Sequence, residues 1–173
     1  MHHNGLENTD YRAYLERFLD STITRVSRVV PDNLPIQTVL DWGSGPTPSL
    51  VALLRERGYD ARGYDPFFLP DFKPFDGGAD LILCLEVAEH FHDPVRSFTE
   101  MSRNLRSGGL LAVKTGFLPD VAEIDFFFAA WWYREDPTHV CFYTERSILA
   151  VGCRAGLVSL GFAGKDIALF KKP

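Results

Sequence analysis

Two kinds of hydrophobic spacing alternate along the chain. In some segments apolar residues recur every three or four positions, which predicts amphipathic helices, and in others they form short runs that predict strands. The expected helices are residues 9–30, 47–57, 94–106 and 144–155. The expected strands are residues 37–42, 60–65, 79–85, 110–115, 157–162 and 165–170. This order predicts an α/β fold, a Rossmann-like three-layer sandwich around a mostly parallel sheet.

The ends of these elements carry recognisable signals. Thr9 and Thr144 are the expected N-caps of the first and last helices, and Pro31 is expected to end the first helix. Gly108-Gly109 is expected to stop the helix over residues 94–106. Residues 157–170 contain two strands joined by only a short glycine-containing link, which predicts a final antiparallel hairpin with its turn at residues 161–164.

Composition indicates one globular domain spanning residues 1–173. Apolar residues make up 46% of the chain, and its net charge of −5 argues against a general nucleic-acid binder. No apolar run reaches the length of a membrane span. The three cysteines form no CxxC pair, and charges run through residues 1–30, where a signal peptide would be apolar. We therefore expect a cytoplasmic protein.

A glycine-rich turn follows the first expected strand. The sequence Asp41-Trp-Gly43-Ser-Gly45 places an acid at the strand end and two glycines where a helix opens. Glycines permit a tight turn and a close approach of the backbone to a ligand. The carboxylate at the strand end has the chemistry to receive an ammonium group.

The spacing within this turn separates two classes of cofactor. A dinucleotide site requires a third glycine three residues after the second, and that place is Pro48. S-adenosylmethionine (SAM) carries no phosphate and brings an amino-acid end, a sulfonium and a ribose. Asp65 follows Asp41 by 24 residues at the end of the second expected strand, where a carboxylate can accept hydrogen bonds from ribose hydroxyls.

A third motif carries a family resemblance. The run Glu86-Val-Ala-Glu89-His90-Phe-His-Asp93-Pro resembles the segment after the fourth strand of class I SAM-dependent methyltransferases, particularly the ubiquinone-biosynthesis type and the type 11 and 23 domains. The segment Asp136-Pro-Thr-His139-Val-Cys-Phe-Tyr-Thr resembles another element of these enzymes. The resemblance covers residues 37–170 and implies the class I methyltransferase fold.

Two departures from the family pattern concern the cofactor site. Thr47 stands where the family has a third glycine, which requires a right-handed backbone at this position. Residues 66–78 leave little room for the usual third strand, so we expect that strand to be short or absent. Phe67, Phe68 and Leu69 are candidates for an apolar wall against adenine.

The motifs and the resemblance together imply SAM as cofactor and S-adenosylhomocysteine (SAH) as product. Asp41, Gly43 and Gly45 are expected at the methionine end of the cofactor, Asp65 at its ribose, and Glu86 and Val87 along its pocket. The full set of expected cofactor-binding residues is Asp41, Gly43, Ser44, Gly45, Asp65, Pro66, Phe67, Glu86 and Val87.

Histidines are the candidate catalytic residues. For an oxygen or nitrogen acceptor, a base of near-neutral pKa would help to remove the acceptor's proton. His139 and His90 are the two expected candidates for this base, and His92 ranks third. Alternatively, His90 caps a helix or fixes a loop, and His139 ties its segment to Asp136. Methyl transfer from a sulfonium requires no metal, and the histidines and carboxylates form no compact ligand set in the sequence, so we predict no metal site.

Aromatic residues are concentrated in residues 117–143, which hold nine of the 23 in the chain. We interpret this insert as a substrate lid or as packing against the sheet, and the helix over residues 9–30 as a second lid. Larger relatives place more chain at the N-terminus, so a partner or a second copy in a homodimer is expected to complete the site.

The expected activity is methyl transfer to a small-molecule acceptor, on oxygen. Leu85-Glu-Val-Ala stands where amino-methylating enzymes carry a D/N/S-P-P-Y/F tetrapeptide, which argues against methylation of nucleobase amino groups. Two alternatives stay open: a SAM-binding domain without catalysis, acting as a regulatory or scaffolding subunit, and a nicotinamide oxidoreductase, against which Pro48 argues.

Overall fold

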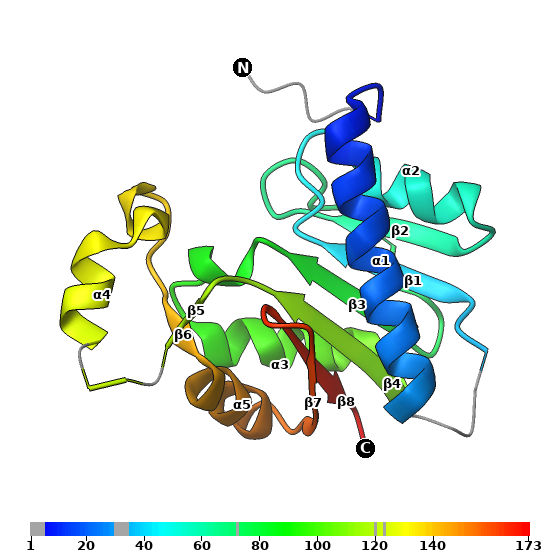
Figure 1. Ribbon diagram of the computed structural model, residues 1–173. Helices are drawn as coiled ribbons and strands as arrows, with labels where there is room; N and C mark the ends of the chain where they lie inside the picture. The colour runs from blue at the N-terminus through cyan, green and yellow to red at the C-terminus, as the bar shows by residue number, and fades with distance from the viewer. Residues whose placement is uncertain (1–5, 30–34, 72, 120, 123) are drawn as a thin grey trace.

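A six-stranded sheet lies between two layers of helices (Figure 1). The structure is a computed structural model that describes residues 6–29, 35–71, 73–119, 121, 122 and 124–173. No helix in these ranges has the length and apolar character needed to span a bilayer.

The sheet has the strand order β2-β1-β3-β4-β8-β7. Its strands are β1 (Thr38–Trp42), β2 (Asp60–Tyr64), β3 (Ala79–Leu85), β4 (Leu105–Lys114), β7 (Val158–Ala163) and β8 (Ile167–Lys171). The first four are parallel, and β8 and β7 form the antiparallel hairpin. Because β2 and β3 lie on opposite sides of β1, the chain reverses its winding direction there, and ligands bind at such switch points in open α/β sheets.

Helices cover both faces of the sheet. The helices are α1 (Thr9–Val29), α2 (Ser49–Glu56), α3 (Pro94–Asn104), α4 (Ile124–Ala130) and α5 (Glu145–Arg154). Alternate side chains of each strand separate the core into two clusters: Leu81 and Leu83 of β3 pack with α1 and α2, whereas Ile82 and Cys84 pack with α3 and α5. This alternation follows from the two-residue repeat of a strand and confirms the expected three-layer sandwich.

Several other predictions from the sequence are confirmed by the structure. Leu50, Val51, Leu53 and Leu54 of α2 are buried, as the helical spacing predicts. Thr144 caps α5 through a reciprocal pair of hydrogen bonds with Ser147. The third strand is absent from the described part of residues 66–78, which contains only an isolated bridge between Asp65 and Leu69.

Three expected boundaries are wrong. The side chain of Asn8, rather than Thr9, accepts from the first backbone amides of α1. Helix α3 ends at Asn104 and β4 begins at the next residue, so Gly108-Gly109 lies inside the strand, beside a register irregularity with β3. The hairpin turn occupies residues 164–166, between the paired Ala163 and Ile167. The expected end of the first helix at Pro31 lies outside the described residues.

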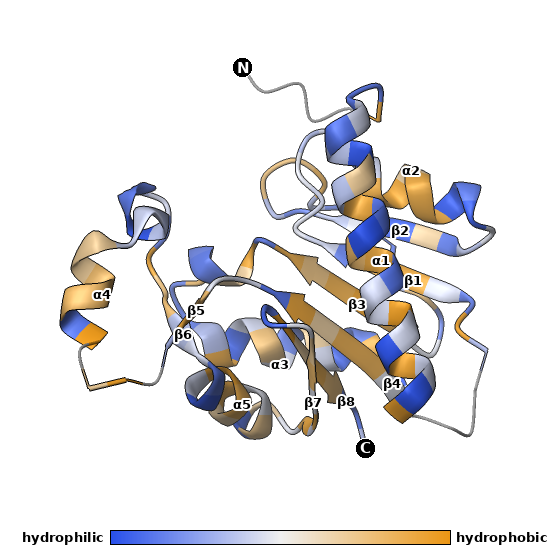
Figure 2. Ribbon diagram, viewed as in Figure 1, coloured by the Kyte–Doolittle hydropathy of each residue, from blue (hydrophilic) through white to orange (hydrophobic). Residues whose placement is uncertain are grey.

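The middle of the aromatic insert stands apart from the sheet, whereas Phe117 and Tyr143 at its ends pack with the core. The insert contains the short parallel pair β5 (Phe117–Leu118) and β6 (Tyr143–Thr144), with α4 and a 3-10 turn, η2 (Trp132–Glu135), between them. Figure 1 shows α4 projecting beyond the edge of the helical layers. Hydrophobic residues colour both the strands and α4 in Figure 2. Phe126 of α4 is 80% exposed, so this part of the insert is not core.

Candidate functional site

The turn after β1 is built around glycines with positive φ. Gly43 has φ +86°, and a Cβ at this position would collide with the side chain of Val87 in the loop after β3. The amides of Gly43 and Ser44 both donate to the carbonyl of Tyr64, at 2.7 and 3.0 Å. The carboxyl ends of β1, β2 and β3 are thereby held together, as the sequence predicts.

A carboxylate at the end of β2 completes this turn. Asp65 is buried, and its Oδ2 accepts from the amide of Gly45 at 3.0 Å. Its Oδ1 accepts from the amides of Phe67 and Phe68 at 2.9 and 3.1 Å. Thr47 does not have a positive φ, which satisfies the requirement set by its replacement of a family glycine.

A second carboxylate, Asp41, lies beneath the turn. It is 4% exposed, and burial together with the nearby charge of Asp65 raises its pKa to about 7. A cation placed beside Asp41 would favour its ionised form.

The side chain of Ser44 contributes less than expected. Its Oγ is buried and has no hydrogen-bond partner among the described residues. It packs against Gly63 of β2, where an added Cβ would lie only 2.8 Å from the oxygen. Ser44 therefore faces the cavity beside it through its backbone rather than through its hydroxyl.

Two cavities adjoin at Gly43 and Glu86, which line both. The first, of about 450 Å³, lies between the glycine turn and α1 and is lined by Tyr11, Tyr14, Gly43, Ser44, Gly45, Pro46, Thr47, Leu85 and Glu86. The second, of about 420 Å³, is lined by Trp42, Gly43, Tyr64, Asp65, Pro66, Phe67, Glu86, Val87, His90, Phe91, Ser97 and Glu100. Apart from Asp41, every expected cofactor residue lines one of them.

The apolar wall of the second cavity differs from the expected one. Phe67 lines this cavity but is 86% exposed, whereas Phe68 and Leu69 are not among its lining residues. The rings of Trp42 and Tyr64 lie 4.4 Å apart and form much of the wall. Each occupies the last position of a strand that ends at the cavity, and this was the sequence signal that could have identified them.

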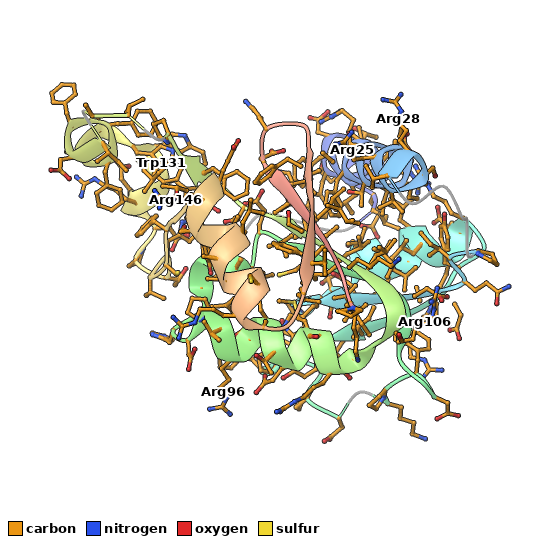
Figure 3. The ribbon with its side chains drawn as sticks, turned by 90° about the horizontal axis from the view of Figure 1, so that it is seen from below. Arg25, Arg28, Arg96, Arg106, Trp131 and Arg146 are labelled. Carbon is orange, nitrogen blue, oxygen red and sulfur yellow. The ribbon has the colours of Figure 1, made fainter. Side chains whose placement is uncertain are left out.

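A third cavity lies on the insert side and also reaches Glu86. It has a volume of about 360 Å³ and is lined by Glu86, Lys114, Thr115, Gly116, Phe117, Trp131, Trp132, Tyr133, Lys165 and Asp166. Figure 3 shows Trp131 in the insert, on the opposite side of the molecule from Arg25 and Arg28 of α1. Glu86 is thus the residue at which all three cavities meet.

Glu86 is held in an uncommon backbone conformation. It is the only described non-glycine residue with a positive φ, +52°. Its Oε1 accepts from the hydroxyl of Tyr14 at 3.1 Å and from Lys114 Nζ at 2.9 Å, and its Oε2 accepts from the hydroxyl of Tyr133 at 3.1 Å. Strained residues of this kind gather at functional sites, where their surroundings fix them.

The two candidate catalytic histidines lie next to each other. The rings of His90 and His139 are 4.9 Å apart, and Glu89 joins them in a cluster of possible ligand atoms that lie within 4.8 Å of one another. The expectation that no compact ligand set forms is therefore wrong, because the insert returns His139 to the loop after β3. His92 is exposed.

Of the two histidines, only His90 lines one of the three cavities. The side chain of His139 is 10% exposed and packs on the ring of Tyr133, with centroids 4.3 Å apart. Its backbone amide also donates to the carbonyl of Asp136 at 3.1 Å, in keeping with the structural alternative for this residue.

Comparison with protein families places residues 11–160 in a single model, described as a methyltransferase domain. This match covers most of the chain, from the first helix to the final hairpin. Comparison of the sequence with curated proteins found no match.

Solved structures with the same fold include three of particular interest. The sugar N-methyltransferase KedS8 from Streptoalloteichus has a TM-score of 0.60 at 15% identity, over 88% of this chain and 86% of that one. Magnesium protoporphyrin IX methyltransferase from Synechocystis, with bound SAH, has a TM-score of 0.58 at 18% identity, over 95% of this chain and 86% of that one. A Haloferax volcanii protein solved in complex with the Trm112 methyltransferase activator has a TM-score of 0.56 at 16% identity, over 88% and 74%.

Proposed function

This chain belongs to the methyltransferase-domain family, and from that premise we propose that it methylates a hydroxyl oxygen of a small-molecule acceptor with SAM as methyl donor. The observation that carries the proposal is the meeting of three cavities at Glu86. A donor that fills two of them would present its reactive centre toward the third, as methyl transfer requires of donor and acceptor.

The first cavity fits the methionine end of SAM. Gly45 has φ +65°, and its Cα faces open space, so the backbone is free to approach a ligand there. Asp41 does not line this cavity, but its buried carboxylate lies beneath the glycine turn, where an ammonium group bound at the turn would favour its ionisation. Tyr11 and Tyr14 of α1 close the opposite wall, which supports the interpretation of α1 as a lid.

The second cavity fits the adenosine end. Asp65 reaches it from the end of β2, and a carboxylate offers about four acceptor sites, three of which already receive backbone amides. The remaining capacity is available to a ribose hydroxyl. Trp42, Tyr64 and Phe91 provide aromatic faces suited to adenine.

The third cavity is the proposed acceptor site. Its rings, those of Trp131, Trp132 and Tyr133, favour a planar or apolar acceptor and exclude water around the transferring methyl group. Burial raises the pKa of the Tyr133 hydroxyl, so this residue stays neutral and orients ligands as a hydrogen-bonding group.

SAM supplies an activated methyl group, and the protein's part is to align the reactants and receive a proton. We propose that His139, which does not itself line the acceptor cavity but packs against Tyr133 in its wall, receives the proton of the acceptor hydroxyl. Its Nδ1 is 2.7 Å from the carbonyl oxygen of Tyr133, which can only accept, so Nδ1 carries the proton and Nε2 keeps its lone pair. His90 lies beside it and reaches the cofactor cavity.

A methyl-transfer assay with radiolabelled SAM and matched panels of phenols, alcohols and amines tests this function. We expect transfer to a hydroxyl compound, loss of transfer in His139→Gln, and unchanged SAH affinity in that variant. His92→Gln is the control, because this exposed histidine lies outside the site. Transfer only to amines would contradict the proposed acceptor atom. SAH binding without transfer to any compound would favour a non-catalytic SAM-binding subunit.

Exposed aromatic residues on the insert suggest how a partner would fit. Phe126 and Trp132 are 80% and 72% exposed, and Trp132 also lines the acceptor cavity. We propose that a second copy of the chain covers this surface and completes the site. Light scattering should then give a dimer for the wild type and a monomer for Phe126→Ser; a monomeric wild type would contradict this.

A further inference from the structure

Three side chains of metal-ligand type converge beside the acceptor cavity. Glu89 and His90 belong to the 3-10 turn η1 (Ala88–His90), and His139 arrives from the insert. One possible ligand atom from each lies within 4.8 Å of the others, and the Nε2 of His139 is 3.9 Å from the Oε1 of Glu89. Two imidazoles and one carboxylate are a ligand set that Zn²⁺ and Fe²⁺ use in proteins.

Backbone carbonyls orient both imidazoles in the same way. The Nδ1 of His90 lies 2.9 Å from the carbonyl oxygen of Thr138, and the Nδ1 of His139 lies 2.7 Å from that of Tyr133. A carbonyl can only accept, so each Nδ1 carries the proton and each Nε2 keeps a lone pair. Metal-binding histidines are commonly held in this way, with the second ring nitrogen donating to a carbonyl or carboxylate.

The carboxylate of Glu89 is also held in place by hydrogen bonds. Glu89 is 1% exposed, and its Oε2 accepts from the hydroxyl of Thr115 at 2.9 Å. Its backbone carbonyl accepts from the amides of Val140 and Cys141, both at 2.9 Å, which ties the turn to the segment that carries His139. No Lys or Arg forms an ion pair with Glu89 among the described residues, and a buried carboxylate without a countercharge is costly.

We propose that Glu89, His90 and His139 bind one divalent transition-metal ion, for which Zn²⁺ is the best-fitting probe. Metal–ligand bonds of about 2 Å require ligand atoms roughly 3.3 Å apart in a tetrahedral site. The present spacing is wider, with 3.9 Å between the Nε2 of His139 and the Oε1 of Glu89, so binding an ion would draw the three side chains closer together. Three protein ligands leave a fourth position open, which is the arrangement of catalytic rather than structural sites.

The site is placed to act on the acceptor. His90 lines the proposed adenosine cavity, and Thr115 and Tyr133, which contact Glu89 and His139, line the acceptor cavity. This step rests on the proposed function: an ion here would lower the pKa of an acceptor hydroxyl. The hydroxyl proton would pass to water, the oxygen would bond to the methyl carbon, and the carbon–sulfur bond electrons would return to sulfur. His139 would then serve as a ligand rather than as the base itself.

Calorimetric titration of the chelator-treated protein with Zn²⁺ tests the site without reference to activity. His2 and His3 are replaced by Gln in every protein, so that the N-terminal imidazoles do not contribute. We expect one ion per chain, and affinity at least ~10-fold weaker in His139→Gln and in Glu89→Gln, since even the loss of a hydrogen-bond partner of a ligand has that effect. His92→Gln is the matched control and should bind as the parent does.

Two further readouts separate this proposal from the proposed function. Co²⁺ substitution should give visible absorption bands that are lost in His139→Gln, and the SAH affinity of the metal-free protein should be the same in all variants. Circular dichroism verifies that Glu89→Gln is folded. Equal Zn²⁺ binding by His139→Gln and His92→Gln would overturn the metal site, whereas absence of SAH binding would overturn the proposed function alone.

Discussion

The backbone amide of Gly45 donates a 3.0 Å hydrogen bond to the carboxylate of Asp65, joining the turn after β1 to the end of β2. The same carboxylate accepts from two amides of the loop that follows it. One side chain therefore fixes the glycine turn and the rim of the proposed adenosine cavity at once. Replacement of Asp65 should therefore weaken ligand binding and disorder the glycine turn at the same time.

Gly43 is expected to tolerate no side chain. Gly43→Ala would place a Cβ against Val87 at φ +86°, so we expect destabilisation of about 2–5 kcal/mol, from left-handed strain and overpacking, together with loss of SAH binding. Gly58→Ala is the control, since Gly58 has φ +89° but open space around it. That variant should lose about 1–2 kcal/mol and keep SAH affinity. Urea unfolding and calorimetry measure both.

A second substitution checks the reason for the effect. Adding Val87→Ala to Gly43→Ala removes the two Cγ atoms that lie nearest to the new Cβ, so part of the lost stability should return. If the double variant is no more stable than expected from adding the two single effects, the collision is not the cause.

Asp41 should make stability depend on pH. Its pKa is about 7 in the folded protein, against an ordinary value of 3.8. Between these values the unfolded chain has released the proton while the folded protein still holds it, so stability falls as pH rises from about 4 to 7 and is then constant. In Asp41→Asn this component is missing.

Urea unfolding across this pH range measures the effect. The stability of Asp41→Asn relative to the wild type should increase by up to about 4 kcal/mol between pH 4 and pH 7, and should not change further above it. Asp60→Asn, at an exposed position of β2, should follow the wild-type profile. Parallel profiles for wild type and Asp41→Asn would contradict the raised pKa.

Glu86 should distinguish the charged donor from the neutral product. SAM carries a sulfonium and SAH does not, and Glu86 lies where the three cavities meet. Glu86→Gln removes a negative charge there, so we expect SAM affinity to fall about 3- to 10-fold more than SAH affinity, the scale of a partly screened charge at about 5 Å. Equal losses for both ligands, measured by calorimetry, would place the sulfonium elsewhere.

Hydropathy patterns predicted the fold because its elements are locally encoded. Leu50 and Leu53 show the helical repeat of α2, and the run from Ala79 to Leu85 shows a strand buried on both faces. The tight turn at Gly43 was predicted because its glycines follow one another closely in the sequence. The start of β4 was misjudged because Gly108 and Gly109 resemble a helix stop, whereas Gly109 is required by the crowding of its backbone against Ala79.

The parts of the site that sequence reasoning missed depend on long-range contacts. Nothing near Glu89 indicates that His139, 50 residues later, returns to it through the insert. The hydrogen bonds that hold the Glu86 carboxylate likewise come from Tyr14, Lys114 and Tyr133, which belong to three separate elements. Trp42 and Tyr64 pair as an aromatic wall only because β1 and β2 are in register.

Calorimetric titration with SAH is the most direct test of the cofactor site. The wild type should bind SAH at micromolar concentration and not bind NADH. Asp65→Asn, which keeps the shape of the side chain but replaces one acceptor oxygen by a donor, should bind SAH at least ~10-fold more weakly. Asp60→Asn should bind as the wild type does. Undiminished SAH binding by Asp65→Asn, or preferential binding of NADH by the wild type, would contradict the assignment.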